Sequence, residues 1–263
     1  MKYFLSLFLL LASMVAAAQQ KVLYQKLKVM TYHIHHANPP SNPELIDLDA
    51  IASVIRKEQP DLVALQEVDV NTGRSGRFNQ AEEIARKLGM QFAFGKAINH
   101  DGGEYGVAIL SRHPISEPVV YRLPTDSASN SERRVLLTAK ITLRGGKVIR
   151  FGSTHLDAEE DPINREMQIS EINRITLKET LPFILAGDLN AAPGSEVIRI
   201  LDRQFTRTCE PCKPTFPVTE PQIAIDFIAI NKVSSFNILD HKVLTEEYAS
   251  DHLPVVVILE LKK

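Results

Sequence analysis

The segment "FILAGDLNAAPGS", residues 183–195, places polar side chains directly after an apolar run. Residues Phe183 to Ala186 are typical of a short buried strand, and Gly187 permits close approach of another backbone. Asp188 and Asn190 follow two positions apart, before a Pro-Gly turn signal. Asp and Asn are also common turn formers. The segment alone therefore predicts either a solvated turn or a functional site at a strand end.

Other apolar runs predict further strands, and their number implies more than one sheet. With the run above, they cover Leu27–Tyr32, Leu62–Gln66, Gln91–Phe94, Val107–Ser111, Val135–Leu143, Val148–Thr154, Ile225–Ile230 and Pro254–Leu261. The pair Gly145-Gly146 joins two of them as a hairpin. Amphipathic spacing predicts helices from Leu48 to before Pro60, over Gln80–Leu88 and over Ile163–Thr180. This mixture favours an α/β layered sandwich over a purely parallel sheet.

The first 18 residues are typical of a secretory signal peptide: a basic Lys2, a mostly apolar stretch, and small residues at Ala16 to Ala18. The apolar stretch is short for a membrane span, so we expect a secreted or periplasmic protein without a stable membrane span. An uncleaved N-terminal anchor is the alternative. Because no linker-like tract divides residues 19–263, we expect them to form a single domain, and a monomer.

The formal net charge of −2 at pH 7 does not indicate a strongly basic surface for binding nucleic acid. It weakens the case for a nucleic-acid-binding module but leaves nucleic acid open as a substrate. The two cysteines, Cys209 and Cys212, form a C-x-x-C. We expect a local disulfide in an exported protein. A zinc site would need two more ligands that no nearby spacing supplies, and a redox role is a weaker alternative.

Polar residues that metal and phosphate chemistry require recur at the ends of the predicted strands. They are His33, His35, His36, Glu67, His155, Asp188, Asn190, Asp226, Asp251 and His252. A single His or Asp near an apolar run is more often a core or turn residue. Their occurrence on successive strands favours one shared site.

The segments "LQEVD", "YGVAILSRHPI", "STHLD", "GDLNAAPGS", "IDFIAI" and "SDHLPV" resemble the endonuclease/exonuclease/phosphatase superfamily of metal-dependent phosphoesterases, in that family's order. The resemblance runs from about Lys26 to the C-terminus. It implies a four-layer α/β sandwich, in which two mixed β-sheets pack face to face and are flanked by helices.

The resemblance makes Glu67 the principal metal carboxylate, with Asp251 near the metal. Hard oxygen ligands favour Mg²⁺ or Mn²⁺ as the cofactor. The chain departs from the family at His33, where relatives commonly carry an Asn that helps to hold the metal and its water. An imidazole is bulkier and titrates near neutral pH, so this residue bears on metal affinity, metal choice and pH optimum.

For catalysis, the resemblance implies that Asp188 orients or deprotonates the attacking water, while Asn190 donates to a nonbridging phosphoryl oxygen. Side chains two positions apart in an extended segment point the same way, which would let both converge on one phosphorus. His252 would contact the scissile phosphate and be held by Asp226.

His155 would donate to another phosphoryl oxygen, with Glu104 as its orienting partner. Four arginines in loops offer either a phosphate grip or a solvated surface. These are Arg74, Arg77, Arg133 and Arg134.

Together these features predict a secreted, metal-dependent phosphoric ester hydrolase, a phosphodiesterase that uses an activated water in in-line attack. Its partner would be a phosphate-ester substrate such as a lipid head group, an inositol phosphate or a nucleic acid. Two alternatives remain: a general extracellular nuclease for DNA or RNA, and a catalytically weakened binding protein on the same fold.

Overall fold

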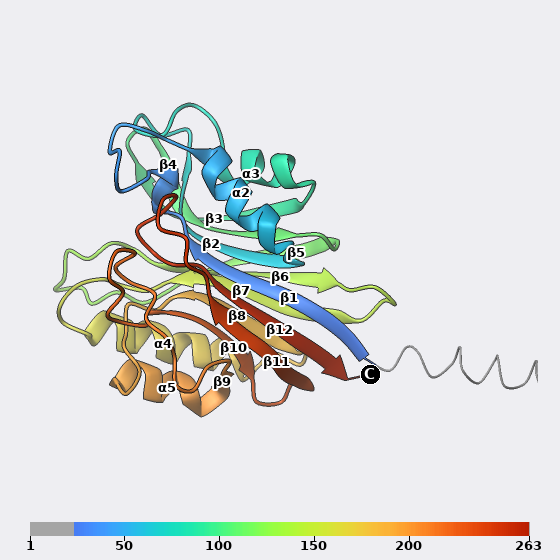
Figure 1. The fold of residues 1–263 in the computed structure, drawn as a ribbon. Helices are drawn as coiled ribbons and strands as arrows, with labels where there is room; N and C mark the ends of the chain where they lie inside the picture. The colour runs from blue at the N-terminus through green and yellow to red at the C-terminus, as the bar shows by residue number, and fades with distance from the viewer. Residues whose placement is uncertain (1–23, 263) are drawn as a thin grey trace, which may run out of the picture.

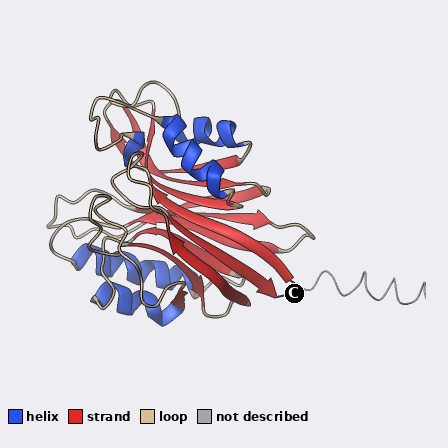
Figure 2. Ribbon diagram, viewed as in Figure 1, coloured by secondary structure: helices blue, strands red, loops and turns tan. Residues whose placement is uncertain are grey.

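Two six-stranded sheets dominate the computed structural model, which describes residues 24–262 (Figures 1 and 2). The first has the order β11-β12-β1-β2-β4-β3, with β1 (Tyr24–His33), β2 (Leu62–Val70), β3 (Gln91–His100), β4 (Gly103–Ser111), β11 (Phe236–Val243) and β12 (Val255–Lys262). The second has the order β5-β6-β7-β8-β10-β9, with β5 (Ile115–Arg122), β6 (Val135–Thr142), β7 (Val148–His155), β8 (Phe183–Asp188), β9 (Phe205–Arg207) and β10 (Asp226–Asn231). The expected signal peptide, residues 1–18, lies outside the described residues.

Within residues 24–262, four α-helices cover the outer faces of the two sheets (Figure 1). They are α2 (Leu48–Glu58), α3 (Gln80–Leu88), α4 (Ile163–Thr176) and α5 (Glu196–Gln204). α2 and α3 bury side chains such as Ile55 and Ile84 against the first sheet. α4 and α5 pack residues such as Ile172 and Leu201 against the second.

A third apolar cluster fills the space between the sheets. Val29 and Ile109 of the first sheet share this cluster with Leu137 and Ile184 of the second. Burial of apolar side chains on both faces of each sheet explains why several strands read as continuous apolar runs. The expected four-layer α/β sandwich is confirmed.

Each sheet contains one parallel pair, β1 with β2 and β7 with β8, among antiparallel neighbours. Both sheets are therefore mixed, as expected. Because parallel strands end at the same edge, β7 and β8 bring His155 and Asp188 opposite each other in register. His33 ends β1 in the other sheet. The carboxyl ends of these strands form the edge where the expected site residues gather.

The expected hairpin at Gly145-Gly146 joins β6 to β7, and its prediction is confirmed. Cys209 and Cys212 form the expected disulfide. In the part of the chain that the structure describes, no helix is both long and apolar enough to cross a membrane.

Several predicted elements were wrong in extent or missing. The helix that begins at Ile163 ends at Thr176 and not at Thr180, because the following amide groups bond three residues back and the chain approaches Pro182. The sequence interpretation did not include the edge strand β5, the strands β9 and β11, or the helix α5. β5 and β11 are largely exposed, so they carry no apolar run that periodicity would detect.

Candidate active site

A bulge in β2 positions Glu67 at the strand-end edge. The register between β2 and β4 shifts between Leu65 and Val68, and Glu67 itself has a φ of 57°. The Tyr105 hydroxyl of β4 donates to Oε1 of Glu67 at 2.9 Å. Burial and the Glu67 charge raise the pKa of Tyr105 well above its usual value, so the phenol stays a donor.

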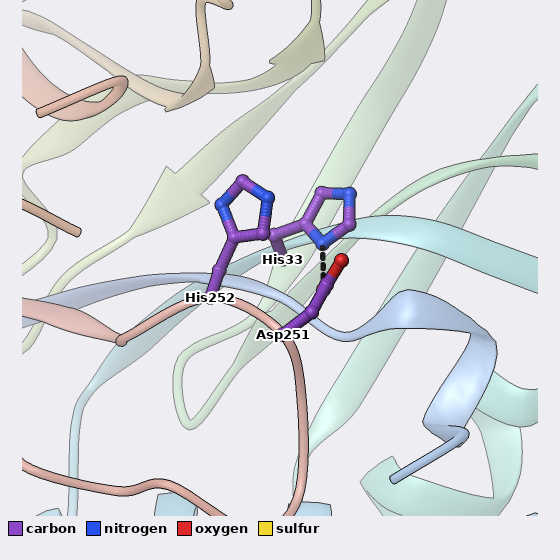
Figure 3. A group of neighbouring side chains, drawn as sticks. All are labelled: His33, Asp251 and His252. Carbon is purple, nitrogen blue, oxygen red and sulfur yellow. Dashed lines mark ion pairs between the residues drawn. The ribbon is translucent and has the colours of Figure 1, made fainter. Parts of the chain in front are cut away.

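His33 lies between the carboxylates of Glu67 and Asp251, and Figure 3 shows its contact with Asp251. Its Nε2 is 3.4 Å from Oε1 of Glu67, and its Nδ1 is 3.3 Å from Oδ1 of Asp251. Burial opposes protonation of His33, but the charge of Glu67 and the contact with Asp251 outweigh it and raise its pKa well above the usual value. Conversely, His33 overcomes the effect of burial on Asp251 and lowers the pKa of that carboxyl to about 2.

His252 stacks on His33, with ring centroids 4.0 Å apart (Figure 3). Its Nδ1 donates to Oδ2 of Asp226 at 2.9 Å, and the Thr215 hydroxyl donates to the same oxygen at 2.6 Å. Burial and His33 oppose protonation of His252, but the Asp226 carboxylate outweighs them and raises its pKa. The structure therefore brings Asp226 to His252 as the sequence interpretation expected, and leaves Nε2 directed toward the rest of the site.

Asp188 ends β8 and is almost completely buried. Its Oδ2 lies 3.6 Å from Nε2 of His155 and 4.0 Å from Nε2 of His252. Burial and the neighbouring Asp226 charge raise the pKa of Asp188 to about 6. A carboxylate with this pKa is suited to accept a proton near neutral pH.

The chain turns directly after Asp188, so the interpretation of an extended segment through Asn190 was wrong. Asn190 has a φ of 46°, and its amide nitrogen donates to Oδ1 of Asp188 at 2.7 Å. Its side-chain Nδ2 donates to the carbonyl of Leu156 at 3.0 Å. Because an amide NH₂ has two donors, one remains for a phosphoryl oxygen. The turn formed by Asp188 and Asn190 is therefore part of the candidate active site.

Arg134, and not Glu104, contacts the far side of His155. The guanidinium NH1 of Arg134 lies 3.2 Å from Nδ1 of His155. Glu104 instead pairs with Lys96 at 2.8 Å, so the interpretation of Glu104 as the partner of His155 was wrong. Burial and the charge of Arg134 lower the pKa of His155 well below its usual value. Since a guanidinium only donates, Nδ1 accepts and the proton of the neutral ring sits on Nε2.

The donor set fits a divalent cation of the kind that the family implies. Glu67 and Asp251 both approach one imidazole, that of His33, from its two nitrogens. Ligand atoms of His33, Asp251 and His252 lie within 4.8 Å of one another. The two carboxylates suit Mg²⁺ and Mn²⁺, and an imidazole beside them favours Mn²⁺ over Mg²⁺.

Two contacts in the site were not expected from the sequence. Tyr105 orients Glu67, and Arg134 orients His155. Arg134 was identified only as one of several loop arginines, and Tyr105 only as part of the motif "YGVAILSRHPI". The position of Arg134 directly before the apolar strand β6 could have indicated its role, because a charged residue at such a position is partly buried and needs a polar partner.

Comparisons with known proteins identify a matching family and similar proteins. The model of the endonuclease/exonuclease/phosphatase family matches residues 30–256. The protein YbhP of Escherichia coli (strain K12) is 28% identical over 243 residues, which cover 87% of this chain and 94% of that protein.

Solved structures of bacterial proteins share the fold. An endonuclease/exonuclease/phosphatase from Beutenbergia cavernae superposes with a TM-score of 0.73 and 26% identity, over 90% of this chain and 72% of that one. The mannosyl-6-phosphatase Bt3783 of Bacteroides thetaiotaomicron superposes with a TM-score of 0.71 and 20% identity, over 89% of this chain and 99% of that one.

Proposed function

Because the chain belongs to the endonuclease/exonuclease/phosphatase family, we propose that it is a secreted, metal-dependent phosphoric ester hydrolase that cleaves a phosphodiester by attack of an activated water. The observation that carries this proposal is the buried carboxylate of Asp188. It lies within 4.0 Å of two imidazoles, each oriented from its other nitrogen. A proton acceptor beside two directed donors is what phosphoryl transfer to water requires.

The three groups around Asp188 have separate roles in the proposal. Asp188 accepts the proton of the attacking water, for which a pKa of about 6 is suitable. The Nε2–H of His155 donates to a phosphoryl oxygen, since Arg134 holds the other nitrogen as an acceptor. His252, held by Asp226, donates to the scissile phosphate from the same side.

The cation site lies beside these donors. A divalent cation, when bound, would supply positive charge to the phosphoryl group and the attacking oxygen. Glu67 and Asp251 would hold it, while Tyr105 keeps Glu67 in one orientation. His33 contacts both carboxylates and lies against His252, so it links the cation site to the donor site.

The site residues act on the phosphoryl group, so they do not by themselves distinguish a diester from a monoester. The family's name covers nucleases, which cleave diesters, and phosphatases, which cleave monoesters. The similar protein Bt3783 is described as a mannosyl-6-phosphatase, so a sugar phosphate belongs among the substrates to test.

Hydrolysis of bis-p-nitrophenyl phosphate tests the reaction. We expect turnover with Mg²⁺ or Mn²⁺ and its loss with EDTA, because a divalent cation at Glu67 and Asp251 would supply the positive charge that the phosphoryl group requires. Activity that persists after complete chelation contradicts the metal mechanism. A parallel screen of plasmid DNA, RNA, sphingomyelin, inositol phosphates and mannose 6-phosphate then separates a dedicated phosphodiesterase from a general nuclease and a phosphatase.

Export is a separate part of the proposal. We expect the chain to lose its first 18 residues and to accumulate outside the cytoplasm as a monomer. N-terminal sequencing of protein from the periplasmic and culture fractions tests cleavage, and size-exclusion chromatography with light scattering tests the monomeric state.

A further inference from the structure

Two histidines directly after β1 form a second cluster on the opposite side of Glu67. These are His35 and His36 in the short helix η2 (His35–Ala37). Ligand atoms of His35, His36 and Glu67 lie within 4.8 Å of one another. We propose that these three side chains bind a second divalent cation, one that prefers nitrogen ligands, such as Zn²⁺, and that shares Glu67 with the first cation.

The two oxygens of Glu67 face different neighbours. Oε1 contacts Nε2 of His33 at 3.4 Å and accepts the Tyr105 hydroxyl at 2.9 Å. Oε2 faces Nδ1 of His36 at 3.7 Å. A carboxylate in this orientation can bridge two cations, one on each oxygen. The hydrogen bond from Tyr105 favours the orientation in which Oε1 lies on the side of His33.

His35 is already oriented as a ligand. Its Nδ1 lies 3.0 Å from the carbonyl oxygen of Asn38. Because a carbonyl only accepts, Nδ1 carries the proton and the lone pair is on Nε2. Metal-binding histidines usually donate their other ring nitrogen to a carbonyl or carboxylate in this way.

His36 presents an unsatisfied nitrogen to the same cluster. Its Nδ1 is buried and has no hydrogen-bond partner within the described chain, although it faces Oε2 of Glu67. A buried polar atom without a partner costs stability and calls for an explanation such as a missing ion. A bound cation would satisfy it.

The backbone holds both histidines in an uncommon conformation. His35, His36 and Ala37 have φ values of 47°, 43° and 59°, in the left-handed region that non-glycine residues rarely adopt. Gln80 fixes this turn: its Nε2 donates to the carbonyl of His36 at 2.6 Å, and its Oε1 accepts the amide of Asp69 in β2 at 2.9 Å. One side chain thus ties the histidine turn to the strand that carries Glu67.

The ligand chemistry distinguishes this site from the one at Asp251. Two imidazoles and one carboxylate, with a position left for water, form a ligand set that zinc takes in hydrolases. Mg²⁺ prefers oxygen ligands and competes poorly for imidazole. The proposal rests on the proposed function only in making Glu67 common to both sites, and the binding itself needs no substrate.

The test counts cations on the full chain, purified without a polyhistidine tag and stripped with EDTA. Zn²⁺ binding is followed by isothermal titration calorimetry, and Co²⁺ binding by visible absorption, which reports nitrogen ligands directly. The variant is His35→Asn. Asn tolerates the left-handed conformation, and its amide nitrogen can still donate to Asn38 as Nδ1 does, whereas the ligand nitrogen Nε2 is lost.

The matched control is His241→Asn. His241 lies in β11, pairs with Thr208 through Nδ1 at 2.9 Å, and belongs to none of the potential metal clusters among residues 24–262. We expect two Zn²⁺ per chain in the unchanged protein and in the control. His35→Asn should weaken the second site by at least about tenfold, since even removal of a ligand's hydrogen-bond partner costs 10- to 100-fold.

Equal Zn²⁺ stoichiometry and affinity in His35→Asn and in the unchanged protein would overturn the proposal. His36→Asn provides an independent variant if His35→Asn does not fold, and it should cause the same loss. Failure of the proposed function would give a different result: the unchanged protein would still bind two Zn²⁺ per chain but would hydrolyse no phosphate ester.

Discussion

At the scale of single residues, His33 stands where the resemblance to the family leads us to expect an Asn. Its ring touches Glu67, Asp251 and His252, so a single substitution alters both the cation site and the donor site. We expect His33→Asn to shift the ratio of Mn²⁺- to Mg²⁺-supported activity toward Mg²⁺ by about tenfold, because the amide offers oxygen where the imidazole offers nitrogen. Activity measured against each cation over a concentration series checks this. An unchanged ratio would mean that His33 does not approach the metal.

Asp188 supplies a second prediction at this scale. Asp188→Asn keeps the shape but removes the proton acceptor, and we expect kcat to fall by about 10² to 10⁴. Because burial and Asp226 raise the pKa of Asp188, its ionised form is disfavoured in the folded protein, and the neutral amide should not lower stability. The melting temperature in EDTA should therefore be equal to or above that of the unchanged protein.

Asp126→Asn is the matched control for Asp188→Asn. Asp126 accepts the amide of Ala128 two residues on at 3.1 Å, the same turn that Asp188 makes with Asn190 at 2.7 Å. It contacts none of the site imidazoles in the described structure. Normal turnover in Asp188→Asn would mean that Asp188 only forms a turn. Loss of turnover in both Asp188→Asn and Asp126→Asn would mean that replacing an Asp in this type of turn lowers activity without any catalytic role for Asp188.

At the scale of elements, the pairing of β7 with β8 depends on Gly187. A Cβ there would lie 2.0 Å from the carbonyl oxygen of Thr154 in β7, and the φ of Gly187 is +156°. We expect Gly187→Ala to cost several kcal/mol, about 3 or more, because two backbones would have to separate. Gly194→Ala is the control: its φ is +88° with nothing within 4 Å of the new Cβ, so about 1 kcal/mol is expected. Urea denaturation of both variants measures the difference.

The loop between β2 and α3 is held by a second buried carboxylate. Asp69 accepts Nε of Arg74 at 2.7 Å, and the Arg74 guanidinium carbon lies 5.6 Å from the centroid of the Tyr105 ring. We expect Arg74→Ala to lower stability by about 1–3 kcal/mol, since it removes charged hydrogen bonds from a buried acceptor. It should also lower activity, because Tyr105 orients Glu67.

Arg77→Ala is the control for Arg74→Ala. In the described structure, Arg77 donates to backbone carbonyls, those of Asn71 at 2.8 Å and Gly102 at 3.5 Å, and it forms no ion pair with a buried carboxylate. Its removal should change stability by less than about 1 kcal/mol and leave activity intact. Equal effects of the two substitutions on denaturation and turnover would refute a specific role for the pair of Arg74 with Asp69.

At the scale of the whole molecule, the site joins the two sheets at one edge. Glu67 and Asp251 come from the first-sheet side, and Asp188 and Asp226 from strands of the second. Cation binding should therefore stabilise the fold as a unit, by about 2.7 kcal/mol at 100 times the dissociation constant. We expect Mn²⁺ to raise the melting temperature and EDTA to reverse the rise. Glu67→Gln should abolish the shift, and a shift that survives in this variant would place the cation elsewhere.

Much of the fold and the list of site residues could be predicted from the sequence. Buried strands such as β8 and β12 read as apolar runs because both faces of each sheet are covered, and helix α3 carries a clear apolar stripe that ends at Gly89. Exposed edge strands such as β5 could not be recognised, since solvent places no apolar requirement on them. Asp188, Asp226 and His252 were identifiable because each lies where an apolar run begins or ends.

Only the tertiary structure decided how those residues meet. The pairing of β6 with β7 decides which side chain orients His155. The sequence interpretation favoured Glu104, whereas the structure places Arg134 there and pairs Glu104 with Lys96. The two carboxylate oxygens of Glu67 contact His33 and His36 because of the bulge in β2 and the left-handed turn after β1. Such contacts join segments far apart in the chain and depend on ångström-scale backbone geometry, which the local pattern of apolar and polar residues does not encode.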